Sequence, residues 1–72
     1  MTLERLRIFV AVAEREHVTS AARALNLTQS AVSNAIAALE TEHGVRLFDR
    51  VGRGVALNEM GRAFLPEARA VL

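Results

Sequence analysis

The stretch VTSAARALNLTQSAVSNAIAA, residues 18–38, decides the fold of this 72-residue chain. Its first part carries apolar side chains at the i, i+3, i+4, i+7 spacing of one helix face: Val18, Ala21, Ala22 and Leu25. Asn26 then interrupts the pattern, and asparagine is one of the few residues that accept the left-handed backbone of a tight helix ending. The stretch therefore predicts a two-turn helix followed by a turn at residues 26–28.

A second, longer helix follows this turn, and we predict it over residues 29–42. Thr28 is its expected N-cap, and a buried stripe follows at helical spacing: Val32, Ala35, Ile36 and Leu39. Gly44 suits the left-handed position just after a helix end. A short helix, a three-residue turn and a longer helix in this order form the outline of a helix-turn-helix.

The exposed face at the start of the second helix is small and uncharged, with Gln29, Ser30, Ser33 and Asn34. A solvated helix face normally carries charged side chains, yet no acidic residue occurs between Glu16 and Glu40. Glutamine and asparagine pair bidentately with adenine, and serine hydrogen-bonds to several bases. The joint pattern favours insertion into a DNA groove over a solvated helical hairpin.

The segment after this helix, residues 46–57, predicts a β-hairpin. Two short apolar stretches flank the sequence VGRG, residues 51–54, whose glycines suit a tight hairpin tip. Such a hairpin looks like a wing, and an arginine at its tip suits the negative potential of the minor groove. For Arg53 we favour this DNA contact. For Arg50, DNA contact and pairing with a carboxylate, such as that of Asp49 or Glu42, are equal alternatives.

Helices are also expected at both ends of the chain. The first runs from Thr2, a suitable N-cap, to about Arg15. The last begins at Asn58, and Pro66 within it predicts a kink or an altered turn. The predicted fold class is mostly α: a winged helix-turn-helix with a three-helix core and a short two-stranded wing, followed by one further helix.

The last helix carries an apolar surface that one domain of this size cannot easily cover: Phe64, Leu65, Ala68, Val71 and Leu72. An exposed apolar patch of this kind usually marks an interface, and we predict that it mediates dimerisation. The alternative is that Met60, Phe64 and Ala68 pack inward on the first helix and that no pairing occurs.

The composition excludes several classes of site. The chain has no cysteine, which excludes disulfides, thiolate catalysis and zinc fingers. Its two histidines, His17 and His43, are far apart in the sequence and do not make a metal site. No nucleophile–base pair, carboxylate pair or phosphate-binding loop is visible, so we expect no enzyme, no catalytic residue and no cofactor in this domain.

The ends of the sequence carry information on location and length. The start lacks the apolar run of a signal peptide, and no stretch approaches the roughly 20 apolar residues of a membrane span. We therefore expect a cytoplasmic protein without membrane contact. Residues 68–72 read as the middle of a helix, so we expect the chain to be a fragment of a longer protein.

Taken in order, these residues resemble the N-terminal DNA-binding domain of bacterial LysR-type transcriptional regulators. The stretches that carry the resemblance are LRIFVAVAE (6–14), AARAL (21–25), TQSAVS (28–33), IAALE (36–40), GVRLFDR (44–50) and LNEMG (57–61). The resemblance implies a winged helix-turn-helix over residues 1–57 and the start of a linker helix for dimerisation over residues 58–72. It also implies a C-terminal domain, absent from this chain, that binds a small-molecule effector.

Carried over by position, the resemblance implies which residues contact double-stranded DNA. Those in or beside the major groove are Thr28, Gln29, Ser30, Ala31, Ser33 and Asn34, and Arg53 is the minor-groove residue of the wing. The regulator would bind an inverted repeat as a homodimer, the full-length protein being a dimer or a tetramer. Asn34 stands where the family often has arginine or lysine, Asn58 replaces a threonine cap, and His17 replaces a serine cap.

A winged-helix module that binds another protein and no DNA is the alternative function. The acid-free stretch after Glu16 and the wing with Arg53 both argue against it. A DNA-binding assay separates the two functions.

Overall fold

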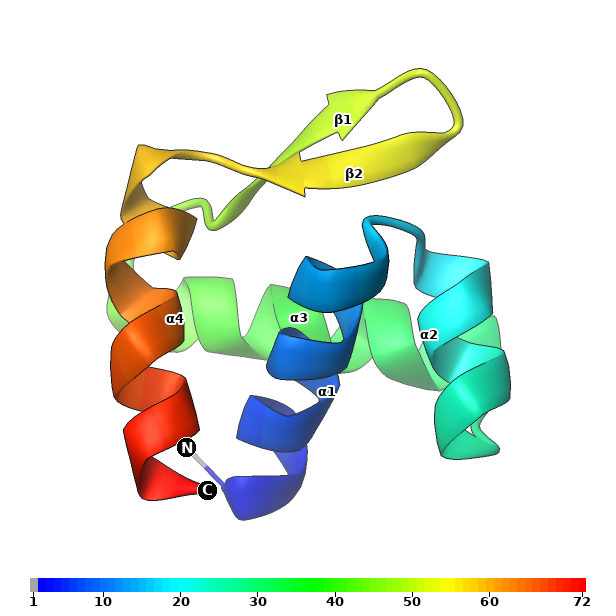
Figure 1. Ribbon diagram of the computed structural model, residues 1–72, viewed down its shortest axis with the longest axis horizontal. Helices are drawn as coiled ribbons and strands as arrows, with labels where there is room; N and C mark the ends of the chain where they lie inside the picture. The colour runs from blue at the N-terminus through cyan, green and yellow to red at the C-terminus, as the bar shows by residue number, and fades with distance from the viewer. Residues whose placement is uncertain (1) are drawn as a thin grey trace.

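The computed structural model describes residues 2–72, which form four helices and one antiparallel pair of strands (Figure 1). The elements are α1 (Leu3–Arg15), α2 (Val18–Leu25), α3 (Gln29–His43), β1 (Phe48–Val51), β2 (Gly54–Leu57) and α4 (Glu59–Val71). Helices α1, α2 and α3 pack together, the β1–β2 hairpin extends along one side of them, and α4 packs against α1. This arrangement confirms the predicted winged helix-turn-helix.

Side-chain caps determine where three of the helices begin. The predicted N-cap residues Thr2, Thr28 and Asn58 each accept a hydrogen bond from the backbone N–H three residues ahead, at 3.1, 3.0 and 2.9 Å. A helix start leaves its first backbone donors unpaired, and each cap satisfies one of them. All three predicted caps are confirmed.

Residues in the left-handed backbone conformation end α1, α2 and α3. Asn26 ends α2 with a φ of 59°, and Gly44 ends α3 with a φ of 67°, both as predicted. Helix α1 ends at Glu16, whose φ is 56°. Glutamate seldom adopts this conformation, so the sequence carries no local signal for this turn.

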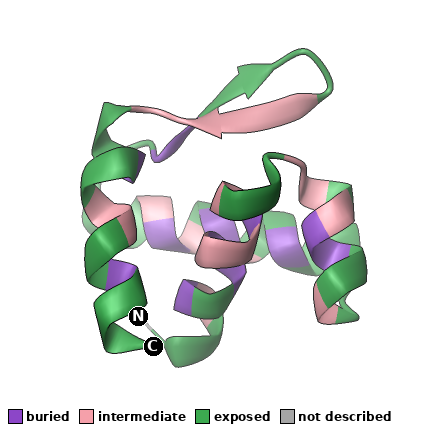
Figure 2. Ribbon diagram, in the orientation of Figure 1, coloured by how far each residue is buried: buried purple, intermediate pink, exposed green. Residues whose placement is uncertain are grey.

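The core is centred on Phe9, whose side chain is fully buried. Its ring centroid lies 5.4 Å from that of Phe48, at the start of β1, and 5.0 Å from that of Phe64 on α4. Tilted and edge-to-face pairs of this kind are preferred by aromatic rings. Phe9 thus joins α1 to the wing and to α4. The other buried hydrophobic residues (Figure 2 shows the buried positions in purple) are Leu6, Ile8, Val12, Ala21, Ala22, Val32, Ile36, Leu39, Leu47, Phe48 and Ala68.

Helix α4 is α-helical from Glu59 to Val71 with Pro66 inside it, so an altered turn type is not observed there, whereas a kink stays a prediction. Packing against α1 supports the helix although proline lacks one backbone donor. Ala68, predicted to lie on a dimer surface, is only 1% exposed and belongs to the core. Helical spacing places Gly61, Phe64 and Ala68 on the face of α4 that turns toward the rest of the domain.

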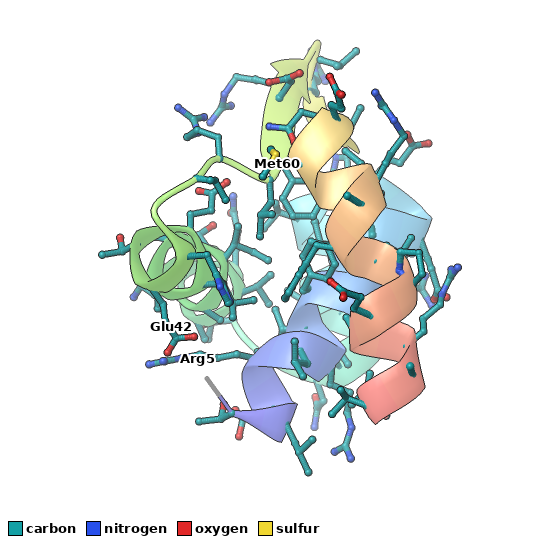
Figure 3. The ribbon with its side chains drawn as sticks, turned by 90° about the vertical axis from the view of Figure 1, so that its left-hand side faces the viewer. Arg5, Glu42 and Met60 are labelled. Atoms are coloured by element: carbon teal, nitrogen blue, oxygen red, sulfur yellow. The ribbon has the colours of Figure 1, made fainter. Side chains whose placement is uncertain are left out.

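The first turn of α4 also lies against the end of α3 and the segment that follows it. Met60, at the top of α4 in Figure 3, is half exposed and lines a groove of about 260 Å³ together with Leu47 and His43. At Gly61 the backbone of α4 comes so near to Leu47 that a Cβ atom would overlap the Leu47 carbonyl oxygen.

Among residues 2–72, no helix has both the length and the apolar character of a membrane span.

We expect Phe9→Leu to lower the free energy of unfolding by about 1–3 kcal/mol, because leucine loses both ring contacts and leaves a small cavity. Urea unfolding followed by circular dichroism measures this change. Leu3→Ala, at a 55% exposed position of the same helix, is the control and should change the free energy by less than about 0.5 kcal/mol. Equal effects of the two substitutions would contradict the central role of Phe9.

Candidate nucleic-acid interface

The first half of α3 presents an exposed polar surface. The six residues predicted to contact DNA from this element are all exposed: Thr28, Gln29, Ser30, Ala31, Ser33 and Asn34. Val32 and Ile36 on the opposite face are buried and hold the helix against α1 and α2. The structure therefore brings these six residues together at one end of one rigid helix.

The electrostatics at this end of α3 favour an anionic partner. The first turn of α3 contains no acidic residue, and neither does the first turn of α2. A helix start carries partial positive charge and unpaired N–H donors, which is why anions bind there. The Thr28 hydroxyl already accepts the Ala31 N–H, so its main role in the structure is to cap α3.

The turn between α2 and α3 sets the angle at which α3 is presented. The Leu27 N–H donates to the Ala22 carbonyl at 2.8 Å, and the Asn26 N–H donates to the Arg23 carbonyl at 3.2 Å. Ala21 and Ala22 are almost completely buried, and their small side chains leave room for neighbouring helices to pack closely.

Helix α2 begins at an unusual cap. His17 takes the N-cap position, and its Nδ1 accepts a hydrogen bond from the Ser20 N–H at 3.3 Å. The imidazole therefore caps the helix in place of the serine hydroxyl that is usual at a helix start. His43, at the other end of the helix-turn-helix, contacts Phe64 in a tilted arrangement with ring centroids 5.2 Å apart. No group of residues within 2–72 has the composition of a metal site.

The wing places two arginines in solvent. Its strands pair in the register Phe48↔Leu57 and Val51↔Gly54, with Gly52 at the turn in a left-handed conformation. Arg50 and Arg53 are both exposed. Neither side chain makes a hydrogen bond or an ion pair with any residue that the structure describes, so the expected alternative pairing of Arg50 with Asp49 or Glu42 is not observed.

A backbone contact that sequence reasoning missed holds the wing against the end of α1. The Val55 N–H donates to the Glu16 carbonyl at 3.0 Å. A Cβ atom at Gly54 would overlap the same carbonyl oxygen. Gly54 is therefore needed for this close approach, whereas the sequence indicated only a hairpin tip. Glu16, whose carbonyl accepts this hydrogen bond, is also the residue whose left-handed backbone ends α1.

A small groove joins the wing to α3. It has a volume of about 160 Å³ and lies between Ser33, Ala37 and Glu40 of α3 and the wing residues Arg50 and Val55. Ser33 and Arg50 thus lie on the two walls of one groove. Of the predicted contact residues, Ser33 and Arg50 are therefore neighbours in space, although they are 17 positions apart in the sequence.

A family model described as bacterial regulatory helix-turn-helix protein, lysR family, matches residues 3–62. The chain belongs to the LysR family. An uncharacterized HTH-type transcriptional regulator of Azotobacter vinelandii is 54% identical over the whole chain, which spans 50% of that protein. A probable hydrogen peroxide-inducible genes activator of Mycobacterium xenopi is 55% identical over 99% of the chain, which spans 38% of that protein.

The fold is that of the LysR DNA-binding domains. This chain superimposes on the CbnR DNA-binding domain, taken from its complex with DNA, with a TM-score of 0.95 and 38% sequence identity. The match covers 99% of this chain and 82% of the CbnR chain. This LysR chain spans half or less of the length of the two curated relatives.

We expect Gly54→Ala to detach the wing from the end of α1 in this LysR domain, because the new Cβ cannot coexist with the Glu16 carbonyl. The Val55 amide should then lose its protection in hydrogen exchange measured by NMR. Gly52→Ala, at a turn position with open space around it, strains the backbone but should leave Val55 protected. Unchanged protection of Val55 in Gly54→Ala would refute this account of the wing.

Proposed function

We propose that the chain binds double-stranded DNA with the first half of α3 in the major groove and the wing at the adjacent minor groove. The observation that carries the proposal is the exposed, uncharged surface from Gln29 to Asn34 on a helix whose opposite face is buried. The major groove of B-DNA admits one α-helix, and base contacts from the start of such a helix are typical of helix-turn-helix proteins. The CbnR DNA-binding domain, which shares this fold, is described in complex with DNA.

Gln29 and Ser33 are the strongest candidates for reading bases. They lie one helical turn apart on the exposed face, so both can reach neighbouring base pairs from one position of the helix. The glutamine amide can pair with N6 and N7 of adenine, and the serine hydroxyl can donate or accept. Asn34 is neutral, so it adds a hydrogen bond to a base or a phosphate but no charge.

In this proposal the two exposed arginines of the wing, Arg53 and Arg50, contact different parts of the DNA. Arg53 follows Gly52 at the tip of the hairpin, where its side chain is exposed and unpaired within the described chain. A narrow, A·T-rich minor groove attracts such an arginine. Arg50 lies nearer to α3, on the wall of the groove shared with Ser33, and suits a phosphate between the two DNA grooves.

We further propose that two copies pair through the outward face of α4. Val71 is 60% exposed and Leu72 is 49% exposed, while Leu65 is half-buried. Phe64 packs against Phe9 and Ala68 is buried, so these two predicted contacts are left out of the interface. A two-fold dimer would place its two α3 helices in major grooves about 34–36 Å apart, or a multiple of that, which fits an inverted repeat.

The whole protein would act as a bacterial transcriptional regulator, as the names of its relatives indicate for those proteins. In this proposal a further domain binds the small-molecule effector, and residues 1–72 contribute DNA binding and no catalysis.

The proposed function is tested by selecting bound duplexes from random DNA with this chain. Gln29→Ala should weaken binding to the selected duplex by about 1–3 kcal/mol and relax the base preference, because a bidentate contact is lost. Thr41→Ala, an exposed position in the second half of α3, is the matched control and should bind like the parent chain. Failure to enrich any sequence would favour the protein-binding module instead.

The dimer is tested with duplexes that contain one or two half-sites. Val71→Glu should leave the monomer folded and reduce affinity for the two-half-site duplex by more than about tenfold, because linked binding is lost. Affinity for a single half-site should stay within about twofold. Ala70→Glu changes the neighbouring exposed position by the same charge and serves as control. Equal losses on both duplexes, or no gain from a second half-site, would exclude the dimer.

A further inference from the structure

The residue Leu47 lies where α3, the wing and α4 meet. It directly precedes β1 and is only 2% exposed. Its N–H donates to Oε2 of Glu40 at 2.7 Å, and its carbonyl accepts the Asn58 N–H at 3.0 Å. The backbone of Gly61 lies so close to the same carbonyl oxygen that a Cβ atom at this position would overlap it. The peptide groups of Leu47 are therefore held on one side by α3 and on the other by the start of α4.

The side chain of Glu40 is positioned mainly by this one contact. Its side chain is 19% exposed, and its carboxylate accepts the Leu47 N–H in a short hydrogen bond. The Arg46 Nε lies 3.9 Å away, and the Arg46 side chain is 79% exposed, so this ion pair is loose. A hydrogen bond to a charged acceptor is stronger than a neutral one, and a buried N–H left without its partner is costly.

Glu40 shares its helix face with residues proposed to contact DNA. Ser33, Ala37 and Glu40 are spaced i, i+4, i+7 on α3, and all three line the groove under the wing. Helix α3 is a continuous helix from Gln29 to His43. A group fixed to Glu40 is therefore fixed relative to Gln29 and Ser33 as well.

The other hydrogen bonds that hold the wing do not involve side chains of α3. The Val55 N–H bonds to the end of α1, and the Asn58 side chain donates to the Arg46 carbonyl at 2.8 Å. Within residues 2–72, Glu40 is the one side chain of α3 that hydrogen-bonds to the segment entering the wing. This carboxylate therefore supplies a direct side-chain hydrogen bond between α3 and the segment that enters the wing, in addition to the core packing of Phe48.

We propose that Glu40 is a positioning residue for DNA recognition: by binding the Leu47 N–H it sets the wing at the distance from α3 at which Arg53 reaches the minor groove beside the bases read by Gln29 and Ser33. The inference rests on the proposed DNA binding. It assigns Glu40 no contact with DNA, and a carboxylate would repel phosphates. Its effect is therefore on the coupling between two separate DNA contacts.

The test is a double-mutant cycle between Glu40 and Arg53. The probe is a single half-site duplex selected by this chain, made once with an A·T-rich flank and once with a G·C-rich flank. In the parent chain, Arg53→Ala should reduce affinity about tenfold on the A·T-rich probe and much less on the other. In a Glu40→Ala background the same arginine substitution should reduce affinity less than about twofold, because the wing no longer holds Arg53 in place.

Three further variants separate positioning from other effects. Glu40→Gln keeps an oxygen that can accept the Leu47 N–H, so it should restore the Arg53 effect on the A·T-rich probe. Glu40→Asp keeps the charge but shortens the reach, so it should behave like Glu40→Ala and replaces it if that variant does not fold. Glu67→Ala, at an exposed position of α4, controls for the loss of one negative charge and should leave the Arg53 effect unchanged.

The outcomes are distinct. A merely structural role for Glu40 would lower stability and affinity on both probes while Arg53→Ala keeps its full effect, and this result would overturn the proposal. If Arg53→Ala still reduces affinity about tenfold on the A·T-rich probe in the Glu40→Asp background, the proposal is overturned as well. Absence of any selected duplex would instead refute DNA binding itself, so the two failures are distinguishable.

Discussion

Burial of the Phe9 ring is the interaction on which the other parts of the domain depend. The ring contacts Phe48 at the start of the wing and Phe64 on α4, so one side chain of α1 supports two elements that are remote in sequence. A two-stranded hairpin is only marginally stable by itself. It is held here because Phe48 enters the same core and because Val55 and Leu47 are anchored by hydrogen bonds to other elements.

The same core leaves the first half of α3 free for a partner. Val32 and Ile36 are buried against the other helices, while the face from Gln29 to Asn34 remains exposed. Because the buried face fixes the helix, the exposed side chains are presented from a rigid support rather than from a loop. A rigid support reduces the entropy lost on binding, which suits a site that must discriminate between base sequences.

The parts of the site that follow local rules could be predicted from the sequence. N-caps, left-handed helix endings and the polar face of α3 depend on residues within a few positions of one another. The anchors of the wing could not be predicted. The Glu16 carbonyl is a backbone atom, and the partner of Glu40 is a backbone N–H seven residues away. Every residue has a backbone carbonyl and every residue except proline has an N–H, so side-chain identity does not reveal which of these groups are used.

The sequence by itself determined the helix-turn-helix, the wing and the family, since periodicity, caps and glycine spacing are local properties of the chain. Only the tertiary structure decided which apolar residues of α4 are available: Phe64 packs against Phe9 and Ala68 is buried in the core, whereas Val71 and Leu72 stay exposed. It also decided that Gly54 serves a close contact with Glu16 and that Glu40 joins α3 to the wing. These outcomes depend on how the elements pack, because packing brings together groups that the chain keeps apart.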